Sequence, residues 1–324
     1  MLSQCRICRV RADHPHFLVR EMMFGSGEEF QYFECSSCGC LQIAEVPANL
    51  SKYYPKDYYS FSRPTAGSPL KRRLRRFRTA YLLGRGNGIG RMLAWRYTPP
   101  PKVARRMEWL RRAGAAPDDS ILDVGCGGGH HLLRLFDLGL SNLTGIDPYL
   151  DRDIHYPGGV VIWKRELSEQ DGAYDFIMLH HSFEHMPDPF AALSDVRRLL
   201  KPGHCALVRI PVTGCEAWRI YGPHWVSLDA PRHLFLYNDK SMRILAEAAG
   251  LRLEEVVYDS TGRQFWGSEL FRRGIPLSEN GAGGADAPDG IFSAQELRSF
   301  EERAEALNRD GRGDIACFYL RRPV

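Results

Sequence analysis

Two cysteine pairs stand near the start of the chain, at Cys5, Cys8, Cys35 and Cys38. Thiolates three residues apart on a tight turn can occupy neighbouring corners of a tetrahedron, and a second such pair completes a closed four-thiolate site. Gly39 follows the second pair, where the backbone has to turn sharply. We therefore expect these cysteines to bind a structural zinc ion that folds the head of the chain. Cys40 could replace Cys38 as a ligand, and unliganded thiols or a redox pair are the alternatives.

A glycine-rich stretch between two acidic residues is the second group that could do chemistry. Asp123 ends an apolar run and precedes Gly125, Gly127 and Gly129, and Asp147 ends the next apolar run. Glycines let the backbone pass close to a ligand. A dinucleotide fingerprint would need a glycine at position 130, where this chain has a histidine. Asp123 suits a cationic amine and Asp147 suits two ribose hydroxyls, so the pattern predicts a site for S-adenosylmethionine (SAM).

This stretch resembles the first two motifs of class I SAM-dependent methyltransferases. The resemblance lies in DVGCGGG, which begins at Asp123, and in GID, which ends at Asp147, and it continues to DVRRLLKPG before the fifth expected strand. It implies that the cofactor pocket is lined by Gly125, Gly127, Asp147, Leu179 and His180. It also makes Glu166 a candidate for binding the adenine amine, with a surface glutamate as the alternative.

Histidines and a glutamate follow the fourth expected strand, where an acceptor would approach the methyl group. Methyl transfer to a hydroxyl requires removal of a proton, and histidine suits this task because its pKa is near neutral. We expect His185 to be the general base, with Glu184 orienting it. His181 is the next candidate, and His233 could equally be the base. A structural loop histidine is the alternative for His185.

The segment from about 212 to 236 is too long for a simple connection and is rich in Trp, Tyr, His and Arg. Aromatic rings beside hydrogen-bonding groups are suited to binding a sugar. We expect Trp225, Asp229 and Arg232 to contact the substrate. The alternative is a packed lid without substrate contact.

A four-cysteine head joined to this body resembles bacterial enzymes that methylate sugars, including deoxysugar C-methyltransferases and enzymes of surface-polysaccharide pathways. The segments YYPKDYYSF, from Tyr53, and DAPRH, from Asp229, add to the resemblance. It implies that Glu184 and His185 match the Glu-His pair that serves as the base in the C-methyltransferases. The 66 residues after Tyr258 leave no room for the additional C-terminal domain of those enzymes, and Ser182 stands where they tend to have an aromatic residue. These departures favour O-methylation of a sugar hydroxyl over C-methylation.

The stretch from Arg63 to Arg112 is strongly basic, with 15 Lys and Arg and one acidic residue. Within it, an apolar residue recurs at helical spacing, at Leu70, Leu74, Phe77 and Tyr81. This predicts an amphipathic basic helix over 70–83. The helix could lie on an anionic membrane, where lipid-linked glycans are assembled, or bind RNA phosphates, or pack on the body.

Alternating strands and helices must position these groups. We expect strands at 120–124, 143–147, 159–163, 174–180, 204–210, 251–259 and 314–321, and helices at 129–139, 188–201, 239–249, 264–273 and 293–308. The alternation predicts a parallel sheet covered by helices. The resemblance implies a Rossmann-like α/β fold with a seven-stranded, mostly parallel sheet and an antiparallel last strand. A zinc-ribbon-like head (1–50), a basic connector (51–112) and a methyltransferase domain (113–324) complete the expected organisation.

Composition sets limits on the class of protein. The chain has 324 residues, 44% of them hydrophobic, and a net charge of +4, which is typical of a globular protein. The sequence shows neither an apolar run of membrane-spanning length nor a signal-peptide pattern. We therefore expect a cytoplasmic enzyme, in peripheral contact with the inner membrane face at most. An RNA methyltransferase and a non-catalytic SAM-fold binding protein are the alternatives. The Asn-Pro-Pro-Tyr loop typical of base-amine methylation is absent after Leu179, which disfavours RNA.

Overall fold

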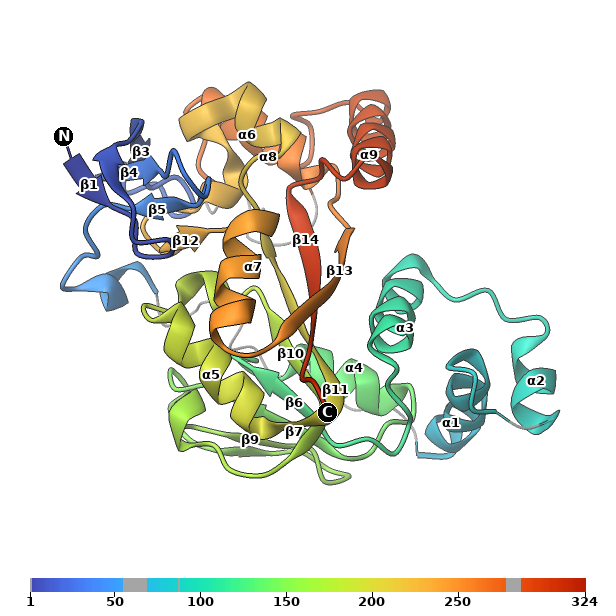
Figure 1. Ribbon diagram of the computed structural model, residues 1–324. Coiled ribbons are helices and arrows are strands. Elements are labelled where there is room, and N and C mark those ends of the chain that lie inside the picture. The colour runs from blue at the N-terminus through green and yellow to red at the C-terminus, as the bar shows by residue number, and fades with distance from the viewer. Residues whose placement is uncertain (1, 55–68, 87, 278–286) are drawn as a thin grey trace.

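The computed structural model describes residues 2–54, 69–86, 88–277 and 287–324 (Figure 1). Residues 55–61 of the tyrosine-rich junction and the side chain of Leu70 lie outside this description.

An eight-stranded sheet forms the centre of the body. Across the sheet the strands are β13 (Arg252–Tyr258), β14 (Ile315–Arg321), β11 (Leu200–Pro211), β10 (Tyr174–His180), β6 (Ile121–Val124), β7 (Leu143–Ile146), β9 (Val161–Trp163) and β8 (Ile154–His155). The five from β11 to β9 are parallel, whereas β14 lies antiparallel between β11 and β13. The Rossmann-like fold and the antiparallel last strand are thus confirmed. All seven expected strands are present, and β8 adds a short antiparallel eighth strand at one edge.

Helices cover both faces of this sheet because successive residues of each buried strand point to opposite sides. On β10, Phe176 packs with the residues of α3 (Pro101–Ala113) and α4 (His130–Asp137). Its neighbour Ile177 packs on the other side with α5 (Pro189–Leu199) and α7 (Asp239–Ala248). Three further helices lie toward the end of the sheet near the head (Figure 1): α6 (Glu216–Tyr221), α8 (Arg263–Arg272) and α9 (Ala294–Arg309). Short 3-10 helices are η1 (Leu50–Tyr53), η3 (Leu167–Glu169), η4 (Phe183–His185), η5 (Gly222–His224) and η6 (Val226–Leu228).

The head consists of a small hairpin and a four-stranded sheet. The hairpin pairs β1 (Leu2–Gln4) with β2 (Arg11–Asp13). The sheet has the order β12 (Phe235–Leu236), β5 (Leu41–Ile43), β4 (Glu29–Glu34) and β3 (His16–Arg20). Since β12 comes from the aromatic segment of the body, the head and that segment share one sheet and one continuous core.

The basic connector contains α1 (Pro69–Leu82), α2 (Gly88–Ala94) and α3. The helix expected over 70–83 is confirmed as α1. In Figure 1, α1 and α2 extend away from the body, and α3 leads back to the sheet. Among the described residues, none of the helices has both the length and the apolar character needed to cross a membrane.

Candidate active site

A cavity of about 630 Å³ lies beyond the carboxyl ends of β6, β7 and β10. This is the usual place for a ligand in an open parallel sheet, and the volume is that of a small-molecule site. Seven of the expected site residues line it: Asp123, Gly125, Asp147, Glu166, His180, His181 and His185. Leu179, which we expected there, is instead fully buried in the core beside the sheet, because its side chain points to the face opposite that of His180.

The glycine turn between β6 and α4 brings backbone close to the cavity. Gly125 has φ +69°, and a Cβ there would lie 2.5 Å from the Cβ of Ser182. Gly129, at φ +81°, precedes α4, and a Cβ there would collide with Ile162. Any other residue at either position would displace its neighbours. The cavity lining does not include Gly127 or Gly129, so we assign both to the shape of the turn.

Asp147 connects this turn to the next strand. Its Oδ2 accepts a hydrogen bond from the Gly127 N–H at 2.8 Å, and its Oδ1 accepts one from the Tyr149 N–H at 3.0 Å. Burial raises the pKa of the carboxyl group. Each carboxylate oxygen has a further lone pair, so Asp147 could accept hydrogen bonds from two adjacent hydroxyl groups in the cavity.

Asp123 is the least satisfied acid of the cavity. Its side chain is 1% exposed, and its Oδ2 has no hydrogen-bond partner among the described residues. Burial, together with the nearby charge of Asp147, raises the pKa of Asp123 to about 8. A buried carboxylate needs a cationic or hydrogen-bonding partner, and a ligand ammonium group would supply both.

Beside Asp123, at the end of β10, lies a group of unsatisfied basic side chains. The His180 ring stacks on His131 at 4.5 Å and lies 4.4 Å from the Trp109 ring, between centroids. Both ring nitrogens of His180, Nδ1 of His131 and Nε of Arg106 have no partner among the described residues. Burial, together with the nearby charges of Arg106 and Arg209, lowers the pKa of His131 to about 3. His131 and His180 line the cavity, whereas Arg106 lies outside its lining and acts on them through its charge. The two neutral imidazoles, with this positive charge nearby, could bind an anion.

The sequence analysis missed Arg106, Trp109 and His131. Only His131 carried a local signal, since it directly follows the glycines and the first residue of α4. Arg106 and Trp109 lie on α3, before β6, and only the packing of α3 brings them here.

His185 lies in η4 and faces the cavity. Its Nδ1 is 2.9 Å from the Arg232 carbonyl oxygen. Because a carbonyl can only accept, Nδ1 must carry the proton, and Nε2 is left as a proton acceptor. Burial lowers the pKa of His185, which keeps the ring neutral. The Tyr54 hydroxyl is 3.1 Å from the same Nδ1, and the Tyr54 ring stacks on Tyr149 at the cavity wall.

Glu184 lies behind His185 and outside the cavity lining. The carboxylate is fully buried, with Nδ1 of His181 at 3.5 Å and Nε2 of His233 at 3.8 Å. Burial raises its pKa, but the three nearby histidines outweigh this effect and lower the pKa to about 2. Glu184 is therefore an anion that can stabilise a protonated histidine. Donor atoms of Glu184, His185 and His233 lie within 4.8 Å of one another, which is also a spacing that a metal ion could bridge.

The two other base candidates have engaged nitrogens. Nε2 of His181 accepts a hydrogen bond from Arg209 at 2.5 Å, while its Nδ1 faces Glu184. His233 donates from Nδ1 to the Ser227 carbonyl at 2.8 Å and does not line the cavity. This arrangement favours His185 as the base.

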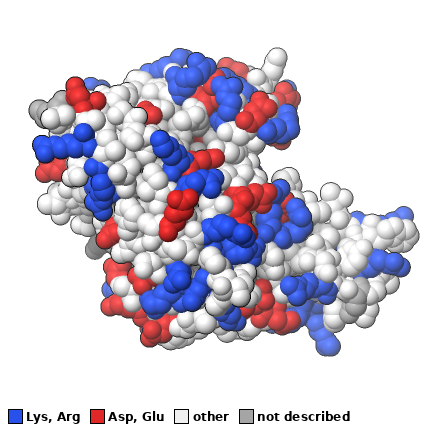
Figure 2. Space-filling view, viewed as in Figure 1, with Lys and Arg blue, Asp and Glu red and all other residues white. Residues whose placement is uncertain are grey.

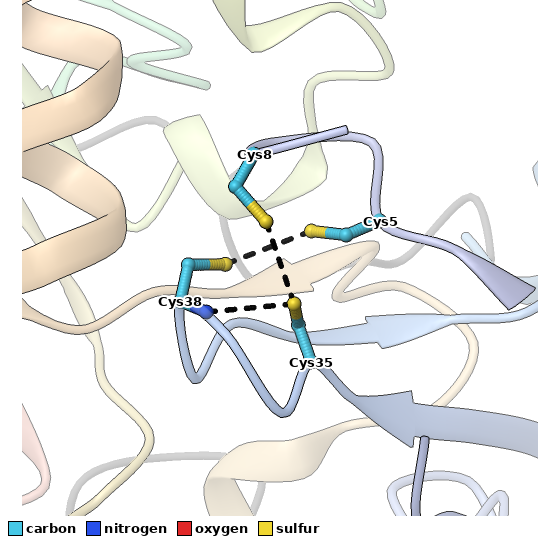
Figure 3. A group of neighbouring side chains, drawn as sticks. All are labelled: Cys5, Cys8, Cys35 and Cys38. Atoms are coloured by element: carbon cyan, nitrogen blue, oxygen red, sulfur yellow. Dashed lines mark hydrogen bonds between the residues drawn. The ribbon is translucent and has the colours of Figure 1, made fainter. Parts of the chain in front are cut away.

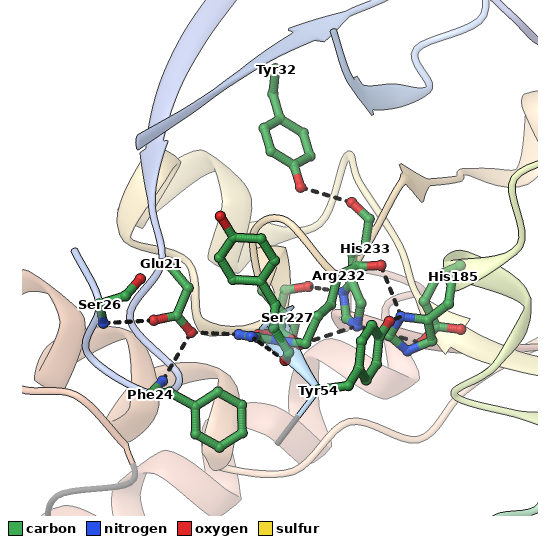
Figure 4. A network of polar contacts seen from close by, with 12 residues as sticks. Glu21, Phe24, Ser26, Tyr32, Tyr54, His185, Ser227, Arg232 and His233 are labelled. Atoms are coloured by element: carbon green, nitrogen blue, oxygen red, sulfur yellow. Dashed lines mark hydrogen bonds and ion pairs between the residues drawn. The ribbon is translucent and has the colours of Figure 1, made fainter. Parts of the chain in front are cut away.

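The expected substrate contacts of Trp225, Asp229 and Arg232 need correction. All three are buried, at 0%, 7% and 0% exposure, and do not line the cavity. Arg232 forms ion pairs with Asp229 at 2.6 Å and with Glu21 of the head at 2.7 Å (Figure 4). Trp225 donates from Nε1 to Asp314. The physical reason is that a buried guanidinium needs carboxylate partners, which Asp229 and Glu21 of the head supply, so Arg232 joins the head to the aromatic segment.

The four cysteines of the head converge, as Figure 3 shows. Sγ of Cys5 lies 3.6 Å from Sγ of Cys38, and Sγ of Cys8 lies 3.5 Å from Sγ of Cys35. Four sulfurs about 2.3 Å from a zinc ion would be separated by about 3.8 Å. Backbone N–H groups of Ile7 and Cys38, and the Gln42 amide, donate to these sulfurs, as thiolates require. The Cys40 thiol lies outside the group and points to the Leu41 carbonyl.

The fold and the acid–turn–acid site define a class I methyltransferase domain. The sequence of residues 94–256, half of the chain, matches the family described as "Methyltransferase domain", and the chain belongs to this family.

Two curated relatives match shorter stretches of the chain. The ubiquinone biosynthesis O-methyltransferase of Pseudomonas aeruginosa strain UCBPP-PA14 is 30% identical over 109 residues, which are 30% of this chain and 47% of that protein. The tRNA U34 carboxymethyltransferase of Methylococcus capsulatus is 30% identical over 131 residues, 36% of this chain and 40% of that protein. The chain thus spans less than half the length of these relatives. A mycolic acid cyclopropane synthase solved with SAH and CTAB aligns with a TM-score of 0.44 at 17% identity, over 68% of this chain and 83% of that chain.

Proposed function

We propose that this protein transfers the methyl group of SAM to a hydroxyl group of a sugar, in a nucleotide-sugar, glycolipid or surface-polysaccharide pathway. The observation that carries SAM binding is the unpaired, buried Asp123 beside the glycine turn and Asp147. The sugar acceptor rests on the resemblance of the four-cysteine head and the Glu-His pair to sugar methyltransferases. A relative whose name specifies O-methyl transfer supports oxygen over carbon as the acceptor atom.

The residues around the cavity fit each part of the cofactor. Asp147 would hold the two ribose hydroxyls, and Asp123 would bind the α-ammonium group. The His131–His180 pair, which lines the cavity, would bind the α-carboxylate, and the positive charge of Arg106 next to this pair would add to the attraction. Glu166 lines the cavity and is the candidate for the adenine amine. When bound, SAM supplies an electrophilic methyl group on a sulfonium leaving group.

His185 would remove the acceptor proton. Nε2 would take the proton that the acceptor hydroxyl loses when its oxygen receives the methyl group. The bond from Nδ1 to the Arg232 carbonyl holds the ring in the required tautomer. The buried charge of Glu184 stabilises the imidazolium that forms.

A zinc ion bound by Cys5, Cys8, Cys35 and Cys38 would act on the reaction only through structure. The ion would fix the structure of the head. In the head, Glu21 forms an ion pair with Arg232, and the Tyr32 hydroxyl donates a hydrogen bond to the His233 carbonyl. Since the Arg232 carbonyl orients His185, the head positions the base.

The test is incubation with labelled SAM and separate fractions of nucleotide-sugars, lipid-linked glycans and RNA. We expect counts in a sugar-containing fraction. His185→Gln should lower turnover by about 10²- to 10⁴-fold while S-adenosylhomocysteine (SAH) affinity stays within about twofold, because the base does not hold the cofactor. His155→Gln, at an exposed position of the edge strand β8, is the matched control and should keep its activity. Counts in RNA would support the RNA alternative, and SAH binding with no labelled product would support a binding protein.

A further inference from the structure

The helices α1 and α2, with the turn to Tyr97, form an arm that extends from the body (Figure 1). The arm comprises residues 69–97, without residue 87. Its polar side chains attach it to the end of α4. The Arg72 guanidinium lies 3.8 Å from the centre of the Phe136 ring, the Thr79 hydroxyl donates to the Leu138 carbonyl at 2.8 Å, and Arg76 donates to the Gly139 carbonyl at 3.2 Å. Part of the charged face of α1, with Arg72 and Arg76, therefore packs on the body.

Apolar side chains of the arm point outward instead. Leu74 and Tyr81 on α1 are 49% and 38% exposed. On and after α2, Ile89, Met92 and Trp95 are 51%, 68% and 81% exposed, at a spacing that places them on one side of the helix. The described part of the chain has twelve exposed large apolar side chains, and five of them lie on this arm. Such clustering marks an interaction surface.

Cations surround these apolar side chains. Lys71, Arg73, Arg85, Arg91 and Arg96 are all exposed. The sequence from 69 to 107 contains no acidic residue. Figure 2 shows the outer part of the arm as white and blue surface. An exposed apolar cluster edged by cations is complementary to a surface that offers both anionic groups and hydrocarbon.

We propose that the arm binds the surface of an anionic phospholipid bilayer, with Ile89, Met92 and Trp95 inserted among the headgroups. Tryptophan suits this interface because its ring is apolar and its N–H is polar. Lys and Arg of the arm bind the lipid phosphates. RNA would use the same cations but would gain little from exposed Ile89 and Met92. The proposal goes beyond methyl transfer, and it moves the membrane contact expected for 70–83 mainly to α2 and Trp95.

The test is flotation of the full chain with phosphatidylcholine vesicles, with and without phosphatidylglycerol. We expect binding only to the anionic vesicles, weakened by salt. Each Lys or Arg at such a surface contributes roughly fivefold to partitioning, so Arg91→Gln with Arg96→Gln should lower it about 25-fold. Met92→Ser with Trp95→Ser should lower it more than tenfold through lost apolar burial. Leu18→Ser, at a 57% exposed leucine of the head, is the matched control and should bind as the parent chain does.

SAH binding by each variant reports that it is folded, and the arm lies outside the cavity lining. If the serine pair does not fold, the glutamine pair at the exposed arginines carries the test. Failure of the parent chain to float with anionic vesicles would overturn the proposal. Arm variants that bind the anionic vesicles as well as the parent chain does would also overturn it. Arm variants that still bind vesicles but no longer bind RNA, measured in parallel, would show that the arm binds RNA instead. The test needs no acceptor, so its outcome is independent of the sugar assignment.

Discussion

Replacing Asp123 by asparagine should remove the pH dependence of cofactor binding. Burial raises the pKa of this carboxyl group to about 8, so the free protein carries a proton on it at neutral pH. A bound ammonium group favours the ionised form, and binding must release that proton. The affinity of the parent chain should therefore rise with pH. Asparagine has the same shape and no titratable proton.

The magnitude follows from the pKa. Each pH unit below 8 costs about 1.4 kcal/mol, or tenfold in affinity, to ionise Asp123. Between pH 6 and 7.5 the affinity for SAH should increase about 20-fold, before the ligand amine loses its own proton near pH 8. Neighbouring His131, with a pKa of about 3, does not titrate in this range.

Isothermal titration calorimetry with SAH in two buffers of different ionisation enthalpy measures both the affinity and the released proton. We expect release of up to one proton by the parent chain and none by Asp123→Asn. A flat affinity for the parent chain between pH 6 and 7.5 would refute the pairing of Asp123 with the ammonium group, as would an equal slope in the variant.

Three further outcomes can be measured. Arg232→Met should lower the free energy of unfolding, measured in urea, by about 3–5 kcal/mol, because it leaves buried carboxylates without a cationic partner. Arg20→Met, which removes a surface ion pair, is the control and should lower it by less than about 1 kcal/mol. The Cys35→Ala variant should contain about one zinc ion fewer per chain by elemental analysis and should have a lower melting temperature. If the parent chain holds a second zinc ion that the His233→Ala variant lacks, a metal lies beside His185, which would contradict the role of His185 as the base. Asp123→Asn should stabilise the fold by roughly 4 kcal/mol at pH 7 and by much less at pH 4. At pH 7 the carboxyl group is ionised in the unfolded chain and must take up a proton on folding, whereas at pH 4 it is already partly protonated in the unfolded chain.

The sheet and the acid–turn–acid pattern could be predicted from the sequence because their signals are local. The run Ile121–Val124 is buried throughout, as a central parallel strand requires, and Asp123 and Asp147 lie at strand ends that share one edge. Two-residue strands such as β8 and β12 carry no periodicity, so they could not be predicted.

The roles of the aromatic segment could not be predicted because they depend on distant partners. The ion pair of Arg232 with Glu21 joins residues 211 positions apart. The composition of the aromatic segment fits a packed lid as well as a sugar site, and the burial of Trp225, Asp229 and Arg232 favours the lid. The group of basic side chains around His131 likewise depends on how α3 packs, which brings Arg106 and Trp109 to His131.

The most direct test of the account is a crystal structure of the chain with SAH. We predict the ammonium nitrogen within hydrogen-bond distance of Asp123, both ribose hydroxyls on Asp147, and the carboxylate beside the His131–His180 pair. SAH bound elsewhere, or bound in the cavity with its amino group away from Asp123, would contradict it.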